Sequence, residues 1–147
     1  MYTKNKKKSK EVDVTLRIIN MNGEIIRKKS ARHIPYERKW FKPSISLTTS
    51  PNKKEILIWA HSNNKKEGKE FKGWVTVLDK ELDIIWQKDF KFNLSLPKKR
   101  ISQSFWKLTN NSKVIFSPNI NKFKSNEKIK FYAITKDASP ISLELNP

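Results

Sequence analysis

The chain alternates short apolar runs with polar turns, most clearly between residues 71 and 92. Residues 75–78 and 84–86 are rich in β-branched and bulky side chains, which suit a pleated and largely buried sheet. Residues 79–81, Asp-Lys-Glu, are poor strand formers and plausible turn residues. This stretch therefore predicts two strands joined by a tight turn.

The same hairpin pattern occurs three times along the chain. Residues 17–27 align with residues 76–86 without a gap, and residues 131–141 form a third and weaker copy. A recurring hairpin is the sequence signature of a repeat architecture.

Further strands are predicted on both sides of the central hairpin. The Asn22-Gly23 pair predicts a hairpin turn, because such a turn needs positive φ values that these two residues adopt at low cost. Residues 55–61, EILIWAH, predict a central strand that is buried on both faces. Residues 30–43 and 62–70 are expected to be loops, and helix is expected to be scarce because no segment has a 3.6-residue period. The remaining predicted strands are residues 11–20, 24–29, 44–49, 102–108, 113–117, 128–135 and 141–145.

The strands group into one half unit, residues 11–30, and two four-stranded units, residues 44–93 and 101–146. The spacing of the full units lies within the range of propeller blades once longer loops are allowed. We therefore expect an all-β fold of antiparallel four-stranded propeller-blade repeats, forming a partial, open propeller, with a β-sandwich as the alternative. Residues 1–10 are expected to be a disordered basic tail, because they have almost nothing apolar to bury.

A resemblance to a known family rests on residues 45–92, which contain SPNKKEILIW, a polar Lys-Glu insert and GWVTVLDKELDIIWQKDF. This segment resembles a blade of a family of uncharacterised bacterial β-propeller proteins of the Bacteroidetes type. The resemblance implies blade architecture and carries no activity. Because family members are several times longer and usually begin with an export signal, it implies a truncated copy of about two and a half blades.

An open propeller leaves sheet edges that ring closure would otherwise protect. The chain is therefore expected to assemble into a ring, to pack as an open sandwich, or to be only marginally stable. Only three glycines are present, so Asn and Lys are expected at positions that blades often give to glycine.

Composition narrows the function classes. The chain has no cysteine, which excludes disulfides, thiolate zinc sites and cysteine nucleophiles. No apolar run reaches the about 18–20 residues that span a bilayer, and the basic start lacks a following apolar segment. The chain as written is therefore expected in the cytoplasm, and the alternative is export if it is a fragment of a longer precursor. The net charge of +18 suggests nucleic acid or another polyanion as a partner. The charge is mostly lysine rather than arginine, which also fits the codon usage of an AT-rich genome.

No catalytic or cofactor constellation is found. His61 closes a buried strand and is expected to be a packed residue, whereas His33 lies in a loop without a second histidine at metal spacing. The chain contains no glycine-rich phosphate loop, nucleophile elbow or metal motif, so neither enzyme activity nor a cofactor is expected. Trp59, Trp74, Trp86 and Trp106 lie in strands and are expected to pack between blades.

The candidate binding surface follows from topology. Since blade strands alternate in direction, the connections between second and third strands, and between successive blades, lie on one face. We expect a non-enzymatic interaction or scaffold module with a protein partner or itself, and the alternative is a basic polyanion binder through this long-loop face. Trp40 either stacks on a ligand or, as we favour, anchors its loop onto the sheet. The candidate residues are Arg32, Arg38, Lys39, Trp40, Lys65, Lys66, Lys69, Lys98, Lys99, Arg100, Lys122 and Lys124.

Overall fold

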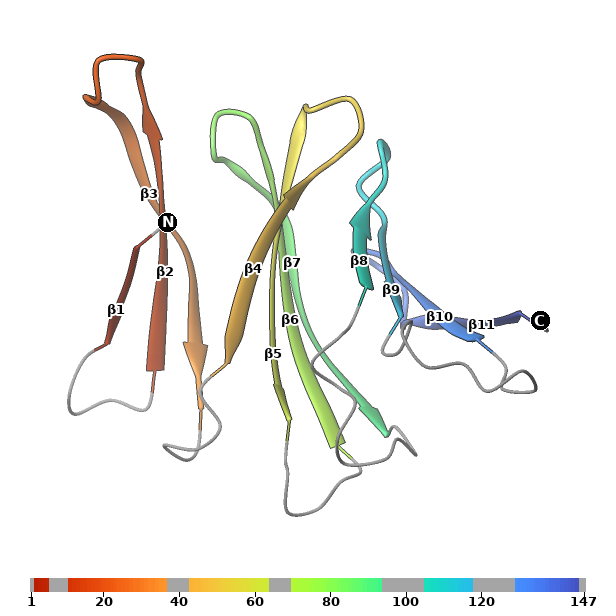
Figure 1. The fold of residues 1–147 in the computed structure, drawn as a ribbon. Coiled ribbons are helices and arrows are strands. Elements are labelled where there is room, and N and C mark those ends of the chain that lie inside the picture. Colours follow the sequence, from red (N-terminus) through yellow and green to blue (C-terminus); the bar gives the residue numbers. More distant parts are fainter. Residues whose placement is uncertain are drawn as a thin grey trace.

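The computed structural model describes residues 2–5, 11–36, 43–63, 70–93, 105–117 and 129–145, and these ranges contain strands and turns but no helix. The strands form three antiparallel sheets (Figure 1). Sheet A has the order β1-β2-β3, sheet B β4-β5-β6-β7, and sheet C β11-β10-β9-β8. The bounds are β1 Tyr2–Asn5, β2 Glu11–Ile19, β3 Ile25–Pro35, β4 Ser44–Thr49, β5 Glu55–Asn63, β6 Glu70–Asp79, β7 Ile84–Asn93, β8 Phe105–Leu108, β9 Val114–Ser117, β10 Ile129–Ile134 and β11 Ile141–Leu145.

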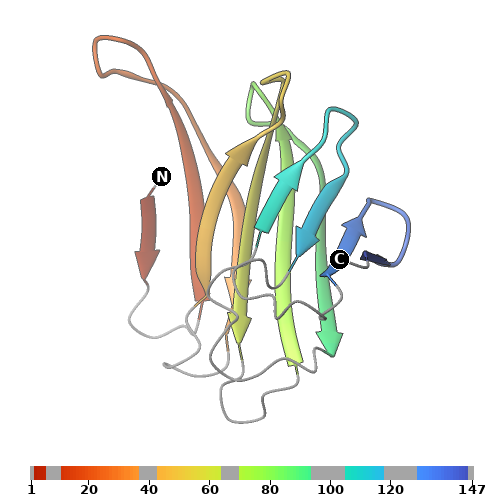
Figure 2. The same ribbon diagram turned by 45° about the vertical axis from the view of Figure 1, so that its right-hand side comes forward.

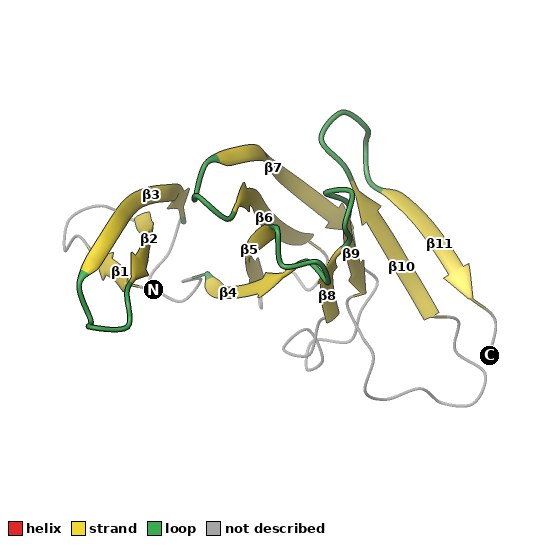
Figure 3. Ribbon diagram, turned by 90° about the horizontal axis from the view of Figure 1, so that it is seen from above, coloured by secondary structure: helices red, strands yellow, loops and turns green. Residues whose placement is uncertain are grey.

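The prediction of an all-β fold with four-stranded antiparallel sheets is confirmed by sheets B and C. The three sheets stand face to face in a row, with sheet B in the middle (Figure 3). Strands β4 and β8 lie in contact at one side of the row, whereas β7 and β11 lie farther apart, so the sheets fan out.

Four of the hairpin turns are built in the same way. In each turn, the side-chain oxygen of the first residue accepts a hydrogen bond from a backbone N–H four or five residues later, which replaces a ladder bond at the strand end. Three residues after this first residue, the backbone enters the left-handed region. The first residues are Asn20, Ser50, Asp79 and Thr109, and the left-handed residues are Gly23, Lys53, Leu82 and Ser112.

The φ angles in these turns correct two expectations about which residues adopt the left-handed conformation. Only Gly23 of the Asn22-Gly23 pair has a positive φ, at 86°. Lysine does occupy a left-handed position at Lys53, as expected, but the other two such residues in the described chain are Leu82 and Ser112 rather than asparagine. A bulky residue in this conformation is strained. Leu82 is also buried between sheets A and B, so its apolar contacts offset that strain.

The register agrees closely with the alignment of the first two hairpins. The β2–β3 ladder shifts between Ile18 and Ile19, and the β6–β7 ladder shifts between the aligned residues Val77 and Leu78. The third hairpin differs. The gapless alignment would pair Ile141 with residue 132, but in the structure Ile141 pairs with Ala133. Residues 135–140 separate β10 from β11, whereas residues 80–83 separate β6 from β7, so the third turn is two residues longer.

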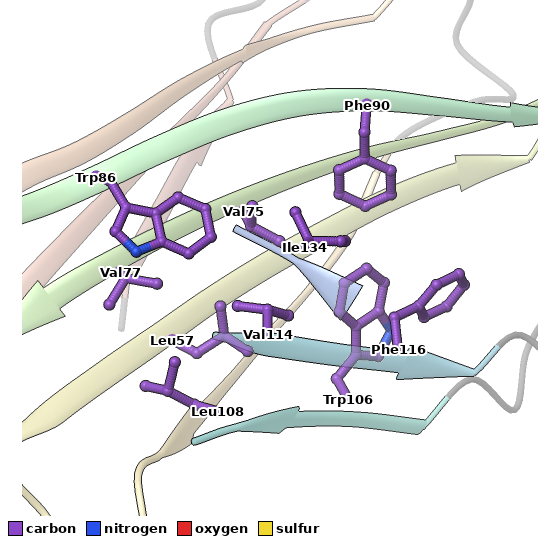
Figure 4. Packing of buried hydrophobic residues seen from close by; sticks show 10 residues of the cluster. All are labelled: Leu57, Val75, Val77, Trp86, Phe90, Trp106, Leu108, Val114, Phe116 and Ile134. Atoms are coloured by element: carbon purple, nitrogen blue, oxygen red, sulfur yellow. The ribbon is translucent and has the colours of Figure 1, made fainter. Parts of the chain in front are cut away.

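Two hydrophobic cores hold the row of sheets together. One lies between sheets A and B and includes Val14, Ile34, Ile58 and Leu78. The other lies between sheets B and C (Figure 4); its buried members are Leu57, Val75, Val77, Trp86, Phe90, Trp106, Leu108, Val114, Phe116 and Ile134. Leu57 and Ile58 are both buried but belong to different cores, which confirms the prediction of a central strand buried on both faces.

Two predicted boundaries are wrong. Residues 30–35 were expected to begin a loop, but β3 continues to Pro35, because Ala31 and Ile34 pack in the core between sheets A and B. Since β3 is an edge strand, a proline at its end breaks no ladder between two neighbours. Tyr2–Asn5, expected to be disordered, form β1 and pair with β2. Backbone pairing on an open edge does not require apolar side chains, which is why composition missed this strand.

Candidate functional site

Arg32, the one described member of the predicted basic face, is not a surface cation. Its side chain is 10% exposed, and its Nη1 donates a hydrogen bond of 2.9 Å to the backbone oxygen of Val75. Its Nη2 pairs with Asp89 of β7. Burial lowers the pKa of Arg32 from its ordinary value. Arg32 therefore ties sheet A to sheet B, and its assignment to an anion-binding face was wrong.

The other predicted face residues lie outside the described residues: Arg38, Lys39, Trp40, Lys65, Lys66, Lys69, Lys98, Lys99, Arg100, Lys122 and Lys124. The β2–β3, β4–β5, β6–β7 and β8–β9 turns lie at one end of the sheets (Figure 2). Because the strands are antiparallel, the strand ends that flank residues 37–42, 64–69, 94–104 and 118–128 lie at the opposite end.

Sheet A reaches the β6–β7 turn of sheet B through two cations of β3. Arg27 Nη2 lies 3.1 Å from Asp83 Oδ1, and Lys29 pairs with the same carboxylate. The hydrogen bond from Lys29, together with the nearby charge of Arg27, lowers the pKa of Asp83. Asp83 is therefore the anchor of this turn on sheet A.

Sheet B contacts the β10–β11 turn of sheet C in a similar way, through Lys88 of β7. Lys88 Nζ donates to the backbone oxygens of Thr135 at 3.0 Å and Lys136 at 3.2 Å, and also to that of Ala138. Trp86 Nε1 donates to the backbone oxygen of Ser112 at 3.1 Å. Sheets A and B therefore each anchor turns of the sheet that follows them along the chain.

The two histidines have opposite environments. His33 is half-exposed on sheet A, with Nδ1 paired to Asp13 and Nε2 2.7 Å from Glu11. The hydrogen bond to Asp13 is the main cause that raises the pKa of His33, and Glu11 adds to it. His61 is buried, and its ring stacks on Trp59 with 5.5 Å between centroids. Burial lowers the pKa of His61, and the prediction that His61 is a packed residue is confirmed.

The strand tryptophans belong to the cores rather than to a ligand platform. Trp74, Trp86 and Trp106 are buried, and the half-buried Trp59 stacks on Trp106 with 4.8 Å between ring centroids. Aromatic pairs at this separation stabilise packing beyond the area that they bury. The prediction that these side chains pack between sheets is confirmed.

The two outer faces of the row of sheets differ in chemistry. The outer face of sheet A, turned away from sheet B, is polar and carries the ion cluster of His33. Its exposed large apolar side chains lie at the end near the β2–β3 turn, where Ile19 is 56% exposed, its cross-strand partner Ile25 50% and Ile26 66%. Away from that end the face is polar, and its members with described side chains there are Glu11, Asp13, Thr15, Arg17, Lys28, Ser30 and His33.

The outer face of sheet C, turned away from sheet B, is apolar. Ile141 is 57% exposed, Leu143 58% and Phe105 39%. Ile141 pairs with Ala133, and Leu143 with Phe131, so these residues share one face across β10 and β11. Ile115 of β9 lies on the same face, opposite the buried Val114 and Phe116. These six residues define what we call the open face of sheet C: Phe105, Ile115, Phe131, Ala133, Ile141 and Leu143.

Sequence reasoning did not identify the open face. The signal was present in residues 141–145, ISLEL, where apolar and polar residues alternate. Alternation shows that one face of a strand is apolar, but it does not show whether another sheet covers that face. Here the apolar residues of β11 point away from sheet B, which only the packing of the sheets reveals.

The described ranges contain neither a metal-binding cluster nor a membrane-spanning helix. Within them, no group of three His, Asp or Glu side chains is arranged to hold a metal ion. The same ranges contain no helix with the length and hydrophobicity needed to cross a bilayer.

Comparisons with family models, with curated proteins and with solved structures find no match for this chain.

Proposed function

We propose that this protein is a non-enzymatic interaction module of propeller-like blades, and that it binds a protein partner through the open face of sheet C. The observation that carries the proposal is the exposure of Ile141 and Leu143 on a sheet face that is apolar except for Lys107 on its edge strand β8. Exposed contiguous apolar patches on a folded protein are typical of interaction sites.

A comparison of the three sheets supports this role. In the alignment of the hairpins, Ile141 corresponds to Arg27 of sheet A and Trp86 of sheet B. Arg27 contacts sheet B, and Trp86 is buried against sheet C. On sheets A and B this position is therefore part of a sheet-to-sheet interface, whereas on sheet C it is open. A partner that covers the open face would complete the same kind of interface.

Site-specific crosslinking tests the proposal, because the chain has no cysteine and a single new thiol can be labelled uniquely. A photoreactive group attached to Leu143→Cys should give one predominant protein adduct, identified by mass spectrometry. The matched control is Lys28→Cys, exposed on the outer face of sheet A. Equal adduct patterns at both positions, or none at Leu143→Cys, would contradict a partner site on sheet C.

A second candidate function is polyanion binding at the end of the sheets opposite the hairpin turns. It is favoured by the antiparallel topology, because the strand ends that flank residues 37–42, 64–69, 94–104 and 118–128 all lie at that end. Together these segments contain eleven of the twelve residues predicted to form a basic binding face. Replacing Lys98, Lys99 and Arg100 with Ser should weaken binding to a DNA oligonucleotide and flatten its salt dependence by roughly one unit per lost phosphate contact. Unchanged binding would remove this candidate.

A further inference from the structure

The chemistry of the open face also indicates what covers it. We infer that its occupant is the open face of a second copy, so that two chains form a two-fold symmetric dimer with sheets in the order A-B-C-C-B-A. This inference rests on the proposed interaction function and names the partner.

The outer face of sheet A is the first occupant to consider, since head-to-tail stacking would continue the row of sheets. Its polar chemistry argues against it. Covering that face would bury the cluster of His33 with Asp13 and Glu11, together with Arg17. Removing such groups from water costs several kcal/mol unless each finds a partner. The six residues of the open face are all apolar and cannot pair with them, and Lys107 beside them adds a like charge to the cations of sheet A. Sheet A therefore resembles the polar terminal repeat that caps a stack.

The open face is complementary to itself. All six of its members are apolar, so two copies placed face to face bury apolar surface on both sides. Lys107 also points to this side, opposite the buried Trp106 and Leu108. Because β8 is an edge strand of sheet C, Lys107 lies at the rim, where its long side chain can keep its ammonium in water.

The overall charge gives the self-association a diagnostic salt dependence. Each chain carries a net charge of +18, so two copies repel one another at low ionic strength. Added salt screens this repulsion and should strengthen an apolar dimer. Polyanion binding responds in the opposite direction, since phosphate contacts weaken as salt rises. The sign of the salt effect therefore separates the two kinds of association.

Sedimentation equilibrium of the full chain across micromolar concentrations tests the inference. We expect a monomer–dimer equilibrium that shifts toward dimer as salt is raised. Leu143→Lys should raise the dissociation constant roughly a hundredfold, because two-fold symmetry introduces the new charge twice at the interface. The matched control, Ile26→Lys, places the same change on the outer face of sheet A, where Ile26 is 66% exposed, and should leave the dimer intact. Ile141→Lys provides a second variant of the open face, and circular dichroism checks that each variant is folded.

Three outcomes would overturn the inference. These are a wild-type monomer at all concentrations, a dimer insensitive to both open-face variants, and a growing series of oligomers that Ile26→Lys abolishes. The last would indicate head-to-tail stacking. If the wild type is monomeric but Leu143→Cys still crosslinks to one other protein, the self-pairing fails while the proposed interaction function stands. If Leu143→Cys also gives no specific adduct, both fail.

Discussion

Lys29 and Lys88 occupy the same position in successive sheets, and each reaches a turn of the sheet that follows. Both lie two residues beyond the shift in their ladders, where Lys29 pairs with Leu16 and Lys88 with Val75. Lys29 contacts Asp83 in the β6–β7 turn, and Lys88 donates to three carbonyls of the β10–β11 turn. The contact of Lys29 is an ion pair, whereas Lys88 donates hydrogen bonds to backbone carbonyls. The same position therefore anchors a turn of the following sheet in both cases, but through different acceptor groups.

This relationship predicts a cost for removing Lys88. Lys88→Met keeps most of the aliphatic stem but leaves the carbonyls of Thr135, Lys136 and Ala138 without the ammonium. Because hydrogen bonds from charged donors contribute about 1.5–3 kcal/mol, we expect the free energy of unfolding to fall by about that amount in urea titrations. Lys28→Met on the outer face of sheet A is the control and should change it by less than about 0.5 kcal/mol. Equal effects of the two substitutions would show that Lys88 does not anchor the turn.

Trp86 links sheet B to sheet C by packing and by one hydrogen bond. Trp86→Ala should lower the free energy of unfolding by about 3–5 kcal/mol, since it empties a buried aromatic site between the sheets. Trp86→Phe retains part of the packing but loses the bond to Ser112, and should cost less. A Trp86→Ala variant with an unchanged melting temperature would disprove a core role.

Gly73 is required by the ring of Phe90, its partner across β6 and β7. A Cβ at residue 73 would lie 2.0 Å from Cζ of Phe90, far closer than non-bonded atoms approach. We expect Gly73→Ala to destabilise the protein by about 1–3 kcal/mol through overpacking. In the Phe90→Leu background the same substitution should cost much less, and a double-mutant cycle of unfolding free energies measures that coupling. Additive costs would contradict the steric explanation.

His33 should stabilise the fold more at low pH than at high pH. Its pKa is raised in the folded state by Asp13 and Glu11, so its contribution is fully present below the ordinary value of about 6.5 and is lost as pH rises through the folded pKa. His33→Gln should therefore lower the free energy of unfolding more at pH 5 than at pH 8. Asp13→Asn should bring the pKa of His33, followed by NMR, back toward its ordinary value. A His33→Gln effect independent of pH would refute this linkage.

His61 should act in the opposite direction. Burial lowers its pKa, so the folded state favours the neutral ring and stability is lost as pH falls below about 6.5 toward the folded pKa. Between pH 8 and pH 5 the wild type should lose more stability than His61→Gln, as measured by urea unfolding at both values. If the unfolding free energy of His61→Gln had the same pH dependence as that of the wild type, His61 would not be buried in the neutral state.

Local chemistry in the sequence was sufficient to predict the hairpins. The turn headed by Asn20 and closed by Gly23, and the turn headed by Asp79, depend on residues within a few positions of each other. The two-sided burial of residues 55–61 also followed from their uninterrupted apolar character. These features are readable because side-chain period and turn propensity act over short stretches of chain.

The tertiary structure alone decided which charges and which apolar faces meet. Arg32 looked like a loop cation, and it became a buried tie because Val75 and Asp89, far away in sequence, lie within its reach. Residues 141–145 were predicted to be a strand, but the apolar face formed by Ile141 and Leu143 is open because sheet B packs on the other side of sheet C. Burial depends on the relative placement of whole sheets, and no local pattern contains that information.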